Sequence, residues 1–379
     1  VSSPKLSRAF MQGAADQGAT AIFIGQVCTD AVYFASGFMK KPGVMFTASH
    51  NPARYNGMKM CMPGAIPINE DTGLRAIKSI IEKSQYDVKI KKHGRIVKKD
   101  ILKDYARHVK KFINAKKLRK LKIAVDAGNG MAGKMIPLIY EGIPIKIVPL
   151  YFKLDGTFPN HPADPIKREN ISDLQEAVRE KKCDLGMAFD GDADRIFFVD
   201  ENGNAVNSSL ISALIIKNIL GKNKGQKIIH NVVCSRIVPE TIRKNGGFPI
   251  IERVGHSFIK DTMRRTNAIF ACEHSAHYYY RENYRADSGM ITIEETSIEV
   301  SDKDSKLQEI EAIYKKQRPK KISKIDGITI EFNGWWFNVR PSNTEPLLRL
   351  NLEADSEEKE RRAAEGYEKS LILLFSDFI

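Results

Sequence analysis

Short apolar runs alternate with amphipathic stretches along most of this 379-residue chain. Compact runs of apolar and β-branched residues are typical of strands, and apolar residues spaced three or four apart are typical of helices. Strands are expected at 21–25, 43–46, 121–126, 143–148, 184–189, 195–200, 228–233, 250–254 and 268–272, and helices at 71–83, 172–181, 208–220, 237–245 and 256–266. Strands that alternate with helices in this way predict α/β units with mostly parallel or mixed sheets.

The C-terminal part of the chain has a different pattern. Runs at 327–332, 335–339 and 347–352 follow one another as antiparallel strands do, and Asp355 with Glu358 forms a capping box for a last helix. The patterns together predict an α/β fold of three similar α/β domains with mixed sheets plus a C-terminal α+β domain. The expected domains are 1–103, 104–204, 205–298 and 299–379, and the first boundary follows a basic, polar stretch at 89–103.

Length and composition agree with a multidomain globular protein. A chain of 379 residues is too long for one ordinary core, and 42% hydrophobic with 28% charged residues is typical of globular proteins. The longest apolar runs, 210–220 and 371–375, are shorter than the ~20 residues that a membrane helix requires, so no membrane partner is expected. The five cysteines contain no CxxC pair, which favours a reducing cytoplasm over a disulfide framework or zinc knuckle.

The net charge of +14 raises the question of a nucleic-acid partner. Lysines cluster at 89–99, 116–122 and 315–321, but these runs contain few aromatic residues for base stacking and no known nucleic-acid motif accompanies them. We therefore expect no nucleic-acid partner. The favoured interpretation is that the lysines form a solvated surface. The second is that their positive charges create an electrostatic field that attracts anionic sugar phosphates.

The segment 47–52, Thr-Ala-Ser-His-Asn-Pro, has the character of a phosphoryl-transfer site. A serine that carries a phosphoryl group needs an exposed turn and small neighbours, so that a tetrahedral dianion fits, and Ser49 meets both requirements. The alternative is a serine whose hydroxyl only caps backbone groups of an Asn-Pro turn. Read alone, the segment leaves both interpretations open.

A second polar motif, Asp190-Gly-Asp192-Ala-Asp194-Arg195, lies between two predicted strands. The carboxylates alternate, so they can converge on one side and offer the hard oxygen ligands that Mg²⁺ prefers. An EF-hand is excluded, because Arg195 stands where that loop needs glycine and the flanking runs predict strands. Arg195 is expected to neutralise phosphate or substrate oxygens beside the metal. A plain acidic loop is the remaining alternative.

Two further motifs suit sugar and phosphate binding. Glu273 and Ser275 follow a predicted strand and could hydrogen-bond adjacent sugar hydroxyls, and His277 is then placed for proton transfer, although a lone histidine there is more often structural. Arg340, Ser342, Asn343 and Thr344 combine a fixed cation with small donors in a turn, to which Arg349 adds a second cation. A phosphate cradle is the functional interpretation of this segment, and a capped loop between strands is the alternative.

The four motifs, in this order, resemble those of the α-D-phosphohexomutase superfamily, closest to its phosphomannomutase/phosphoglucomutase branch, over nearly the whole chain. The resemblance implies four domains around a central cleft, with Ser49 as the phosphoserine, whose phosphate joins Asp190, Asp192 and Asp194 as a Mg²⁺ ligand. It adds Lys59 as a proton donor or charge stabiliser and Gly255 with His256 as a substrate loop. The implied reaction interconverts hexose 1-phosphate and hexose 6-phosphate, with hexose 1,6-bisphosphate as intermediate and activator. Mannose phosphates are the first expected substrates and glucose phosphates the second.

The chain departs from the family pattern in three places, of which the first two bear on activity and the third is mild. The first strand of domain 1 and an early arginine have no counterpart before Val1, domain 3 is abridged after residues 289–291, and Cys272 stands where glycine is more usual. The segment that begins at Val1 has no initiator methionine, no apolar leader segment and no cleavage site, which indicates either processing or a fragment, and a fragment is the favoured expectation. The alternatives to a mutase are an inactive fragment or sugar-phosphate-binding protein, and a phosphatase. Hexose phosphates are the expected partners of a monomer or homodimer.

Overall fold

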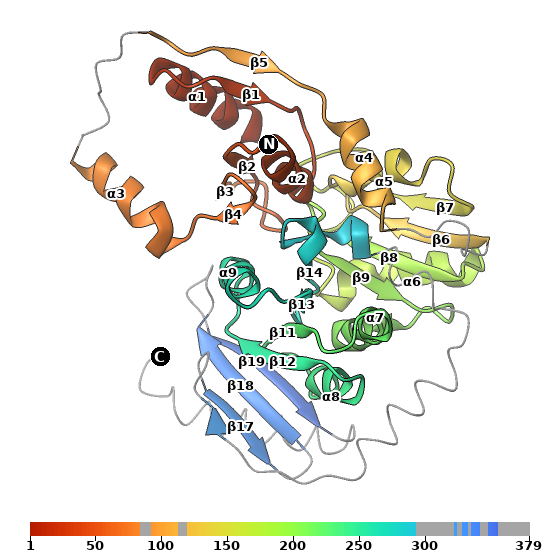
Figure 1. The fold of residues 1–379 in the computed structure, drawn as a ribbon. Coiled ribbons are helices and arrows are strands. Elements are labelled where there is room, and N and C mark those ends of the chain that lie inside the picture. The colour runs from red at the N-terminus through yellow and green to blue at the C-terminus, as the bar shows by residue number, and fades with distance from the viewer. Residues whose placement is uncertain are drawn as a thin grey trace, which may run out of the picture.

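The computed structural model describes residues 1–83, 92–112, 120–292, 322–323, 328–332, 335–341 and 348–354. Within these ranges the strands form sheets in four successive parts of the chain, which Figure 1 shows from red at the N-terminus to blue at the C-terminus. The α/β part of the expected fold is confirmed, since helices alternate with mixed sheets through residue 292. Among the described helices, none has the length and apolar character that a membrane crossing requires.

The first unit contains a sheet in two pieces. Its elements are α1 (Ser3–Asp16), β1 (Ala21–Phe23), α2 (Thr29–Met39), β2 (Gly43–Phe46), β3 (Met58–Met62), β4 (Ile66–Pro67), a π turn (Glu70–Leu74), α3 (Arg75–Glu82) and β5 (Ile96–Lys98). Strand β1 pairs in parallel with β5, whereas β2, β3 and β4 form a separate antiparallel sheet. A cavity of about 1220 Å³ lies between the pieces and is lined by residues of both β1 and β2.

The second unit is a five-stranded mixed sheet in the order β10-β9-β8-β6-β7. Its elements are α4 (Leu102–Lys110), β6 (Leu121–Asp126), α5 (Ala132–Tyr140), β7 (Ile145–Leu150), the 3-10 turn Arg168–Ile171, α6 (Ser172–Glu180), β8 (Leu185–Phe189), β9 (Ile196–Val199) and β10 (Ala205–Val206). Strands β6, β7 and β8 are parallel, and β9 returns antiparallel to β8. The β8–β9 turn therefore lies at the carboxyl end of the buried parallel strands, the edge where α/β sheets usually bind ligands.

The third unit has the sheet order β12-β11-β13-β14-β15. Its elements are α7 (Ser208–Lys222), β11 (Lys227–Asn231), α8 (Ile237–Lys244), β12 (Phe248–Glu252), α9 (His256–Thr266), β13 (Phe270–Cys272), β14 (Tyr278–Tyr280), the 3-10 turn Arg281–Asn283 and β15 (Ala286–Asp287). Strands β13 and β14 are antiparallel, so residues 273–277 form the loop of a hairpin. The shortening of domain 3 that the sequence predicts after residues 289–291 falls beyond residue 292, outside the described residues.

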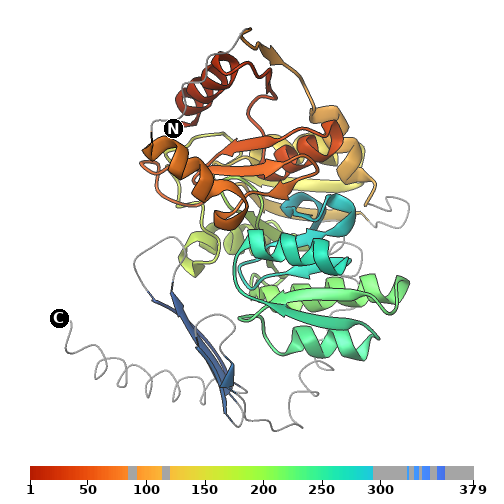
Figure 2. The ribbon, with the colours of Figure 1, turned by 60° about the vertical axis from the view of Figure 1, so that its left-hand side comes forward.

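The C-terminal part is an antiparallel sheet in the order β16-β17-β18-β19, at the end of the molecule away from α1 in Figures 1 and 2. Its strands are β16 (Ile322–Ser323), β17 (Ile328–Phe332), β18 (Trp335–Pro341) and β19 (Leu348–Ala354). The strands predicted at 327–332, 335–339 and 347–352 are confirmed. The helix predicted from Asp355 lies outside the described residues.

Helix α2 joins the first three units. Residues Thr29 to Ser36 of this helix are all buried. Most of its buried apolar side chains belong to one continuous core cluster with residues of α4, β6, β8, α7 and β14. A helix buried over two consecutive turns must be surrounded by protein, because its apolar side chains are stabilised only by burial. The elements that carry the candidate functional residues are therefore held around α2.

Candidate active site

Strand β2 leads the chain into the serine loop, residues 47–57. Ser49 adopts a left-handed backbone conformation, with φ of 53°, and its backbone N–H donates to Thr47 Oγ1 at 2.8 Å. A non-glycine residue in this region is uncommon and is typical of functional turns. The conformation directs the Ser49 hydroxyl across the domain boundary, where it donates to Asp190 Oδ2 at 2.6 Å.

The β8–β9 turn forms the acidic loop, residues 190–195. One carboxylate oxygen from each of Asp190, Asp192 and Asp194 lies within 4.8 Å of the others, and all three side chains are buried. Asp192 Oδ1 and Asp194 Oδ1 accept no hydrogen bond from the described residues. Buried carboxylate oxygens without donors are the environment that a hard divalent cation satisfies, so this cluster fits Mg²⁺.

Two side chains from the first unit contact the same carboxylates. Lys59 Nζ on β3 lies 2.7 Å from Asp192 Oδ2 and 2.5 Å from Asp194 Oδ2. Thr29 Oγ1, at the start of α2, donates to Asp192 Oδ2 at 2.6 Å. Burial alone would raise the pKa of Asp192, but the Lys59 ammonium and the Thr29 hydroxyl hold it below its ordinary value. Thr29 has no sequence signal that could have identified it.

Asp190 and Arg195 form the other side of the acidic loop. Arg195 Nε donates to Asp190 Oδ2 at 3.0 Å, and the guanidinium is almost fully buried. Burial raises the pKa of Asp190 to about 7 despite the opposing charge of Arg195. The Arg195 side chain thus reaches the carboxylate that also accepts the Ser49 hydroxyl, which places a fixed cation beside that hydroxyl.

His50, which the sequence interpretation did not select, contacts both loops. Its Nδ1 lies 3.3 Å from Ser49 Oγ and 2.5 Å from Arg195 Nη2. Burial and then the Arg195 charge lower the pKa of His50 to about 3, so the ring is neutral and Nδ1 accepts from the guanidinium. Its position directly after Ser49 was the available signal.

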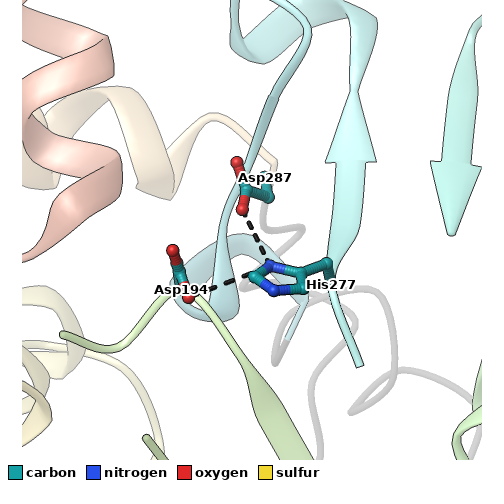
Figure 3. A group of neighbouring side chains, drawn as sticks. All are labelled: Asp194, His277 and Asp287. Carbon is teal, nitrogen blue, oxygen red and sulfur yellow. Dashed lines mark hydrogen bonds and ion pairs between the residues drawn. The ribbon is translucent and has the colours of Figure 1, made fainter. Parts of the chain in front are cut away.

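The hairpin loop, residues 273–277, brings the third motif to the acidic loop. His277 Nδ1 lies 2.8 Å from Asp287 Oδ2 and 3.8 Å from Asp194 Oδ1. Figure 3 shows both carboxylates facing the same side of the ring. Burial alone would lower the pKa of His277, but Asp194 and Asp287 raise it above its ordinary value. Ser275 is half-buried in the same loop. The structure therefore brings residues of the first three motifs into mutual contact.

Glu273 has a tightly held carboxylate. Its Oε2 accepts from the Tyr279 hydroxyl at 2.6 Å, and its Oε1 accepts from Asn231 Nδ2 and from the backbone N–H of Gly255. Gly255, with φ of 133°, is the N-cap of α9, which begins at His256. Glu273 thus connects both expected sugar-binding segments, and its position is set before any ligand arrives. Burial lowers the pKa of His256 to about 3, so this ring is neutral.

The fourth motif is described only in part. Arg340 on β18 pairs directly with Arg349 on β19. Ser342, Asn343 and Thr344 lie outside the described residues. The structure therefore places the two expected arginines at one register position of the antiparallel sheet, beside the loop that joins their strands.

Family models and relatives identify the chain. Four models of the phosphoglucomutase/phosphomannomutase family match it in order: α/β/α domain I at residues 1–87, domain II at 103–203, domain III at 207–317 and the C-terminal domain at 295–369. A phosphomannomutase of Vibrio cholerae is 38% identical over 93% of this chain and 84% of its own length. A phosphomannomutase/phosphoglucomutase of Pseudomonas aeruginosa is 34% identical over 96% of this chain and 83% of its own.

A solved structure agrees with these matches. A phosphoglucomutase/phosphomannomutase family protein from Burkholderia thailandensis superposes with a TM-score of 0.84 and 28% identity, covering 98% of this chain and 86% of that one. Three α/β domains and a C-terminal domain, with a serine facing an acidic loop, define the phosphohexomutase class. The chain belongs to the phosphoglucomutase/phosphomannomutase family and is an isomerase of that family.

Proposed function

We propose that this enzyme interconverts hexose 1-phosphate and hexose 6-phosphate, with mannose phosphates as preferred substrates and glucose phosphates as possible ones. The observation that carries the proposal is the 2.6 Å contact between Ser49 Oγ and Asp190, at the edge of the acidic cluster. A serine hydroxyl beside a potential Mg²⁺ site is the arrangement that phosphoryl transfer requires. The relatives named for this activity support the proposal.

In the proposed reaction, Ser49 begins as a phosphoserine. A sugar hydroxyl oxygen forms a bond to phosphorus while the bond between phosphorus and Ser49 Oγ breaks, and the hydroxyl proton passes to Nε2 of His277. The product is a hexose bisphosphate, which turns over. Ser49 Oγ then forms a bond to the other phosphorus while the bond from that phosphorus to the sugar oxygen breaks, and the sugar oxygen takes the proton back from Nε2 of His277. Mg²⁺ held by Asp190, Asp192 and Asp194 would stabilise charge on the transferring oxygens. Lys59 and Arg195 supply fixed positive charges beside them.

The remaining predicted residues bind the substrate in this proposal. Glu273, Ser275, Gly255 and His256 hold the sugar hydroxyls, and the segment from Arg340 to Thr344, with Arg349, holds the phosphate that is not transferred. We also propose the domain limits 1–103, 104–204, 205–298 and 299–379. The order of the four matched family regions supports this division, although residue 103 lies in the first turn of α4.

Intact-mass measurement and a coupled assay test the function. We expect a phosphate on Ser49 and a Mg²⁺-dependent conversion of mannose 1-phosphate to mannose 6-phosphate, which chelation of Mg²⁺ abolishes. Ser49→Ala should lose both the phosphate and the conversion, whereas Ser172→Ala, an exposed serine on α6, should keep both. Release of inorganic phosphate without isomerised sugar would instead indicate a phosphatase.

A second candidate is a sugar-phosphate-binding protein that does not complete the reaction. The divided sheet of the first unit favours it, because β2, which leads into the serine loop, pairs with β3 alone among the described strands. A strand paired on one edge holds the following loop less rigidly than one paired on both. Folded protein that binds mannose 1-phosphate in calorimetry but shows neither phosphate on Ser49 nor product would establish this candidate.

A further inference from the structure

A buried ion pair lies behind the His277 ring. Lys260 Nζ on α9 is 2.7 Å from Asp287 Oδ1, and the other oxygen of Asp287 is the one that lies 2.8 Å from His277 Nδ1. Lys260 has no exposed surface, and Asp287 is only 1% exposed. The three side chains therefore form a continuous line from α9 to the hairpin loop, and nothing in the proposed reaction uses the lysine directly.

The burial of Lys260 needs an explanation. An ammonium removed from water is costly unless it is paired, and an apolar side chain of similar size would usually be as stable at such a position. Its Nζ lies 3.7 Å from the centre of the Tyr33 ring on α2, which adds a cation–π contact. A second ring, that of Tyr279, has its centre 5.9 Å from Nζ. Lys260 thus has one carboxylate partner and two aromatic rings around its ammonium.

The donor and acceptor chemistry of the line determines which nitrogen of His277 carries a proton. A lysine ammonium can only donate, and an ionised carboxylate can only accept. The Lys260 ammonium lies 2.7 Å from Asp287 Oδ1, and so close a positive charge favours the ionised carboxylate. Nδ1 must then carry the proton that Asp287 Oδ2 accepts, which leaves Nε2 of a neutral ring free to accept a proton.

We propose that Lys260 and Asp287 are positioning residues that hold His277 in the Nδ1-protonated tautomer, with Nε2 available to the sugar hydroxyl. The inference rests on the proposed function for its catalytic consequence, but the tautomer itself is independent of any reaction. Lys260 orients Asp287 through one oxygen, and Asp287 orients the imidazole through the other. An aspartate that fixes a histidine tautomer is a recurrent arrangement in enzymes that move protons through histidine.

A metal ion is the competing explanation for this cluster. Asp194, His277 and Asp287 offer ligand atoms within 4.8 Å of one another. However, a histidine nitrogen that donates its proton to a carboxylate has no lone pair for a metal, and Lys260 already neutralises Asp287. The two explanations differ in whether Nδ1 carries a proton.

Nitrogen NMR of ¹⁵N-histidine-labelled protein tests the tautomer directly, with the resonances of His277 assigned by their loss in His277→Gln. In the wild type, at a pH where the ring is neutral, we expect a proton on Nδ1 and none on Nε2, with and without Mg²⁺. A proton on Nε2 instead, or loss of the Nδ1 proton on adding Mg²⁺ or Zn²⁺, would overturn the proposal. The tautomer is read in the wild type, and the variant serves only for assignment.

Asp287→Asn provides a sharper test because the direction of the amide is predictable. The Lys260 ammonium attracts the amide oxygen, so the NH₂ group turns toward His277, Nδ1 becomes an acceptor and the proton moves to Nε2. In the double variant Asp287→Asn with Lys260→Met, nothing holds the amide in that direction, and the Nδ1-protonated tautomer should recover. A tautomer that is the same in the wild type and D287N would contradict the role of Asp287, and no recovery in the double variant would contradict that of Lys260.

Activity provides a separate readout. We expect Asp287→Asn to lower kcat by roughly 10²- to 10⁴-fold, with KM changed less than about threefold, as when a histidine tautomer is wrong. Asp261→Asn, an exposed position on α9 beside Lys260, should keep kcat within about twofold.

The two proposals fail separately. If neither the wild type nor any variant is active, the proposed function fails while the NMR result still decides the tautomer. If D287N shows the wrong tautomer with wild-type kcat, the positioning role is overturned.

Discussion

At the scale of single residues, Gly191 in the acidic loop determines how closely the serine loop and the acidic loop approach. A Cβ atom at this position would lie 2.5 Å from the carbonyl oxygen of Ser49 and 3.2 Å from the Phe158 ring. Real Cβ atoms do not approach backbone oxygens so closely, so the serine loop must move away if any side chain is added. The short contact between Ser49 and Asp190 therefore depends on the absence of a side chain at residue 191.

Gly191→Ala tests this dependence. We expect kcat/KM to fall by about 10- to 100-fold, because displacement of a reacting group by a fraction of an ångström to 1 Å is enough for such a loss. Gly221→Ala, in α7 with no atom within 4 Å of the added Cβ, is the matched control. It should keep activity and stabilise the fold by roughly 0.5–1 kcal/mol, because alanine favours helix. Steady-state kinetics and thermal unfolding measure both effects, and wild-type kinetics in G191A would contradict the argument.

His161 in the second unit provides a prediction for pH. Its Nε2 lies 3.0 Å from Asp126 Oδ2 and its Nδ1 2.9 Å from the carbonyl oxygen of Pro162, so the doubly protonated ring has an acceptor at each nitrogen. Burial alone would lower the pKa of His161, but Asp126 and the carbonyl raise it above the ordinary 6.5. The stability contributed by the protonated ring is therefore fully present below pH 6.5 and is lost as the pH rises through the folded-state pKa.

His161→Gln should consequently destabilise the protein more at pH 5.5 than at pH 9. The difference is expected to be a few tenths to about 1 kcal/mol, the range of partly exposed ion pairs. Urea unfolding of the wild type and the variant at the two pH values measures it. An equal loss at both pH values, or a larger loss at pH 9, would show that the Asp126 contact does not depend on protonation.

At the scale of elements, α9 connects the third unit to the first. Arg264 Nη2 donates to the carbonyl oxygens of Gly64 and Ala65, in the turn between β3 and β4, and to that of Tyr284, at 2.8–3.0 Å. Burial and the neighbouring Arg285 lower the pKa of Arg264 to about 10, so the guanidinium remains charged at neutral pH. One side chain therefore holds backbone groups from both units.

Removal of this contact should loosen the β3–β4 turn. We expect Arg264→Gln to cost about 1–3 kcal/mol of unfolding free energy, since carbonyl groups lose a charged donor, and to speed amide exchange around residues 62–67. Arg265→Gln, the exposed neighbour on α9, should change stability by less than about 0.5 kcal/mol. Hydrogen exchange read by mass spectrometry distinguishes the two variants, and unchanged exchange in R264Q would mean that other contacts hold the turn.

The local spacing of apolar residues predicted most helices and strands, but not those that form only through packing or pairing with distant parts of the chain. Strands 43–46 and 121–126 and helix 256–266 lie at their predicted positions, because their apolar residues follow the strand or helix period. Helix α2 was missed because it is buried on almost every side and has no polar face to mark its period. Strand β5 was missed within the polar stretch 89–103, because all its side chains are exposed and only backbone pairing with β1 makes it a strand.

At the scale of the whole molecule, the first unit is the least completely formed part of the described structure. The β1–β5 pair is an isolated two-stranded sheet, and two strands are marginal in water. Strand β8, by contrast, is buried at every residue in the middle of a five-stranded sheet. The stability of the molecule should therefore decrease from the second and third units toward the first.

Hydrogen exchange of the intact protein tests this gradient. Amides of β1 and β5 should exchange at least about 100-fold faster than those of β8, because opening the pair exposes little apolar surface. The comparison is internal, since all strands are measured in one sample by mass spectrometry of peptic fragments. Equal protection of β1 and β8 would mean that the divided sheet unfolds only together with the rest of the protein.

The sequence alone determined the chemical types at the site. A serine in a small-residue turn, alternating aspartates between strands, and a glutamate, serine and histidine after a strand are all readable, because each motif is short and local. The tertiary structure decided which of these groups meet, and it added Thr29, His50, Lys260 and Asp287, of which only His50 had a local signal. The physical reason is that burial and charge pairing depend on how elements pack. Thr29 contacts Asp192, 163 positions away, and the Lys260–Asp287 pair joins a helix to a strand, and no local pattern contains either contact.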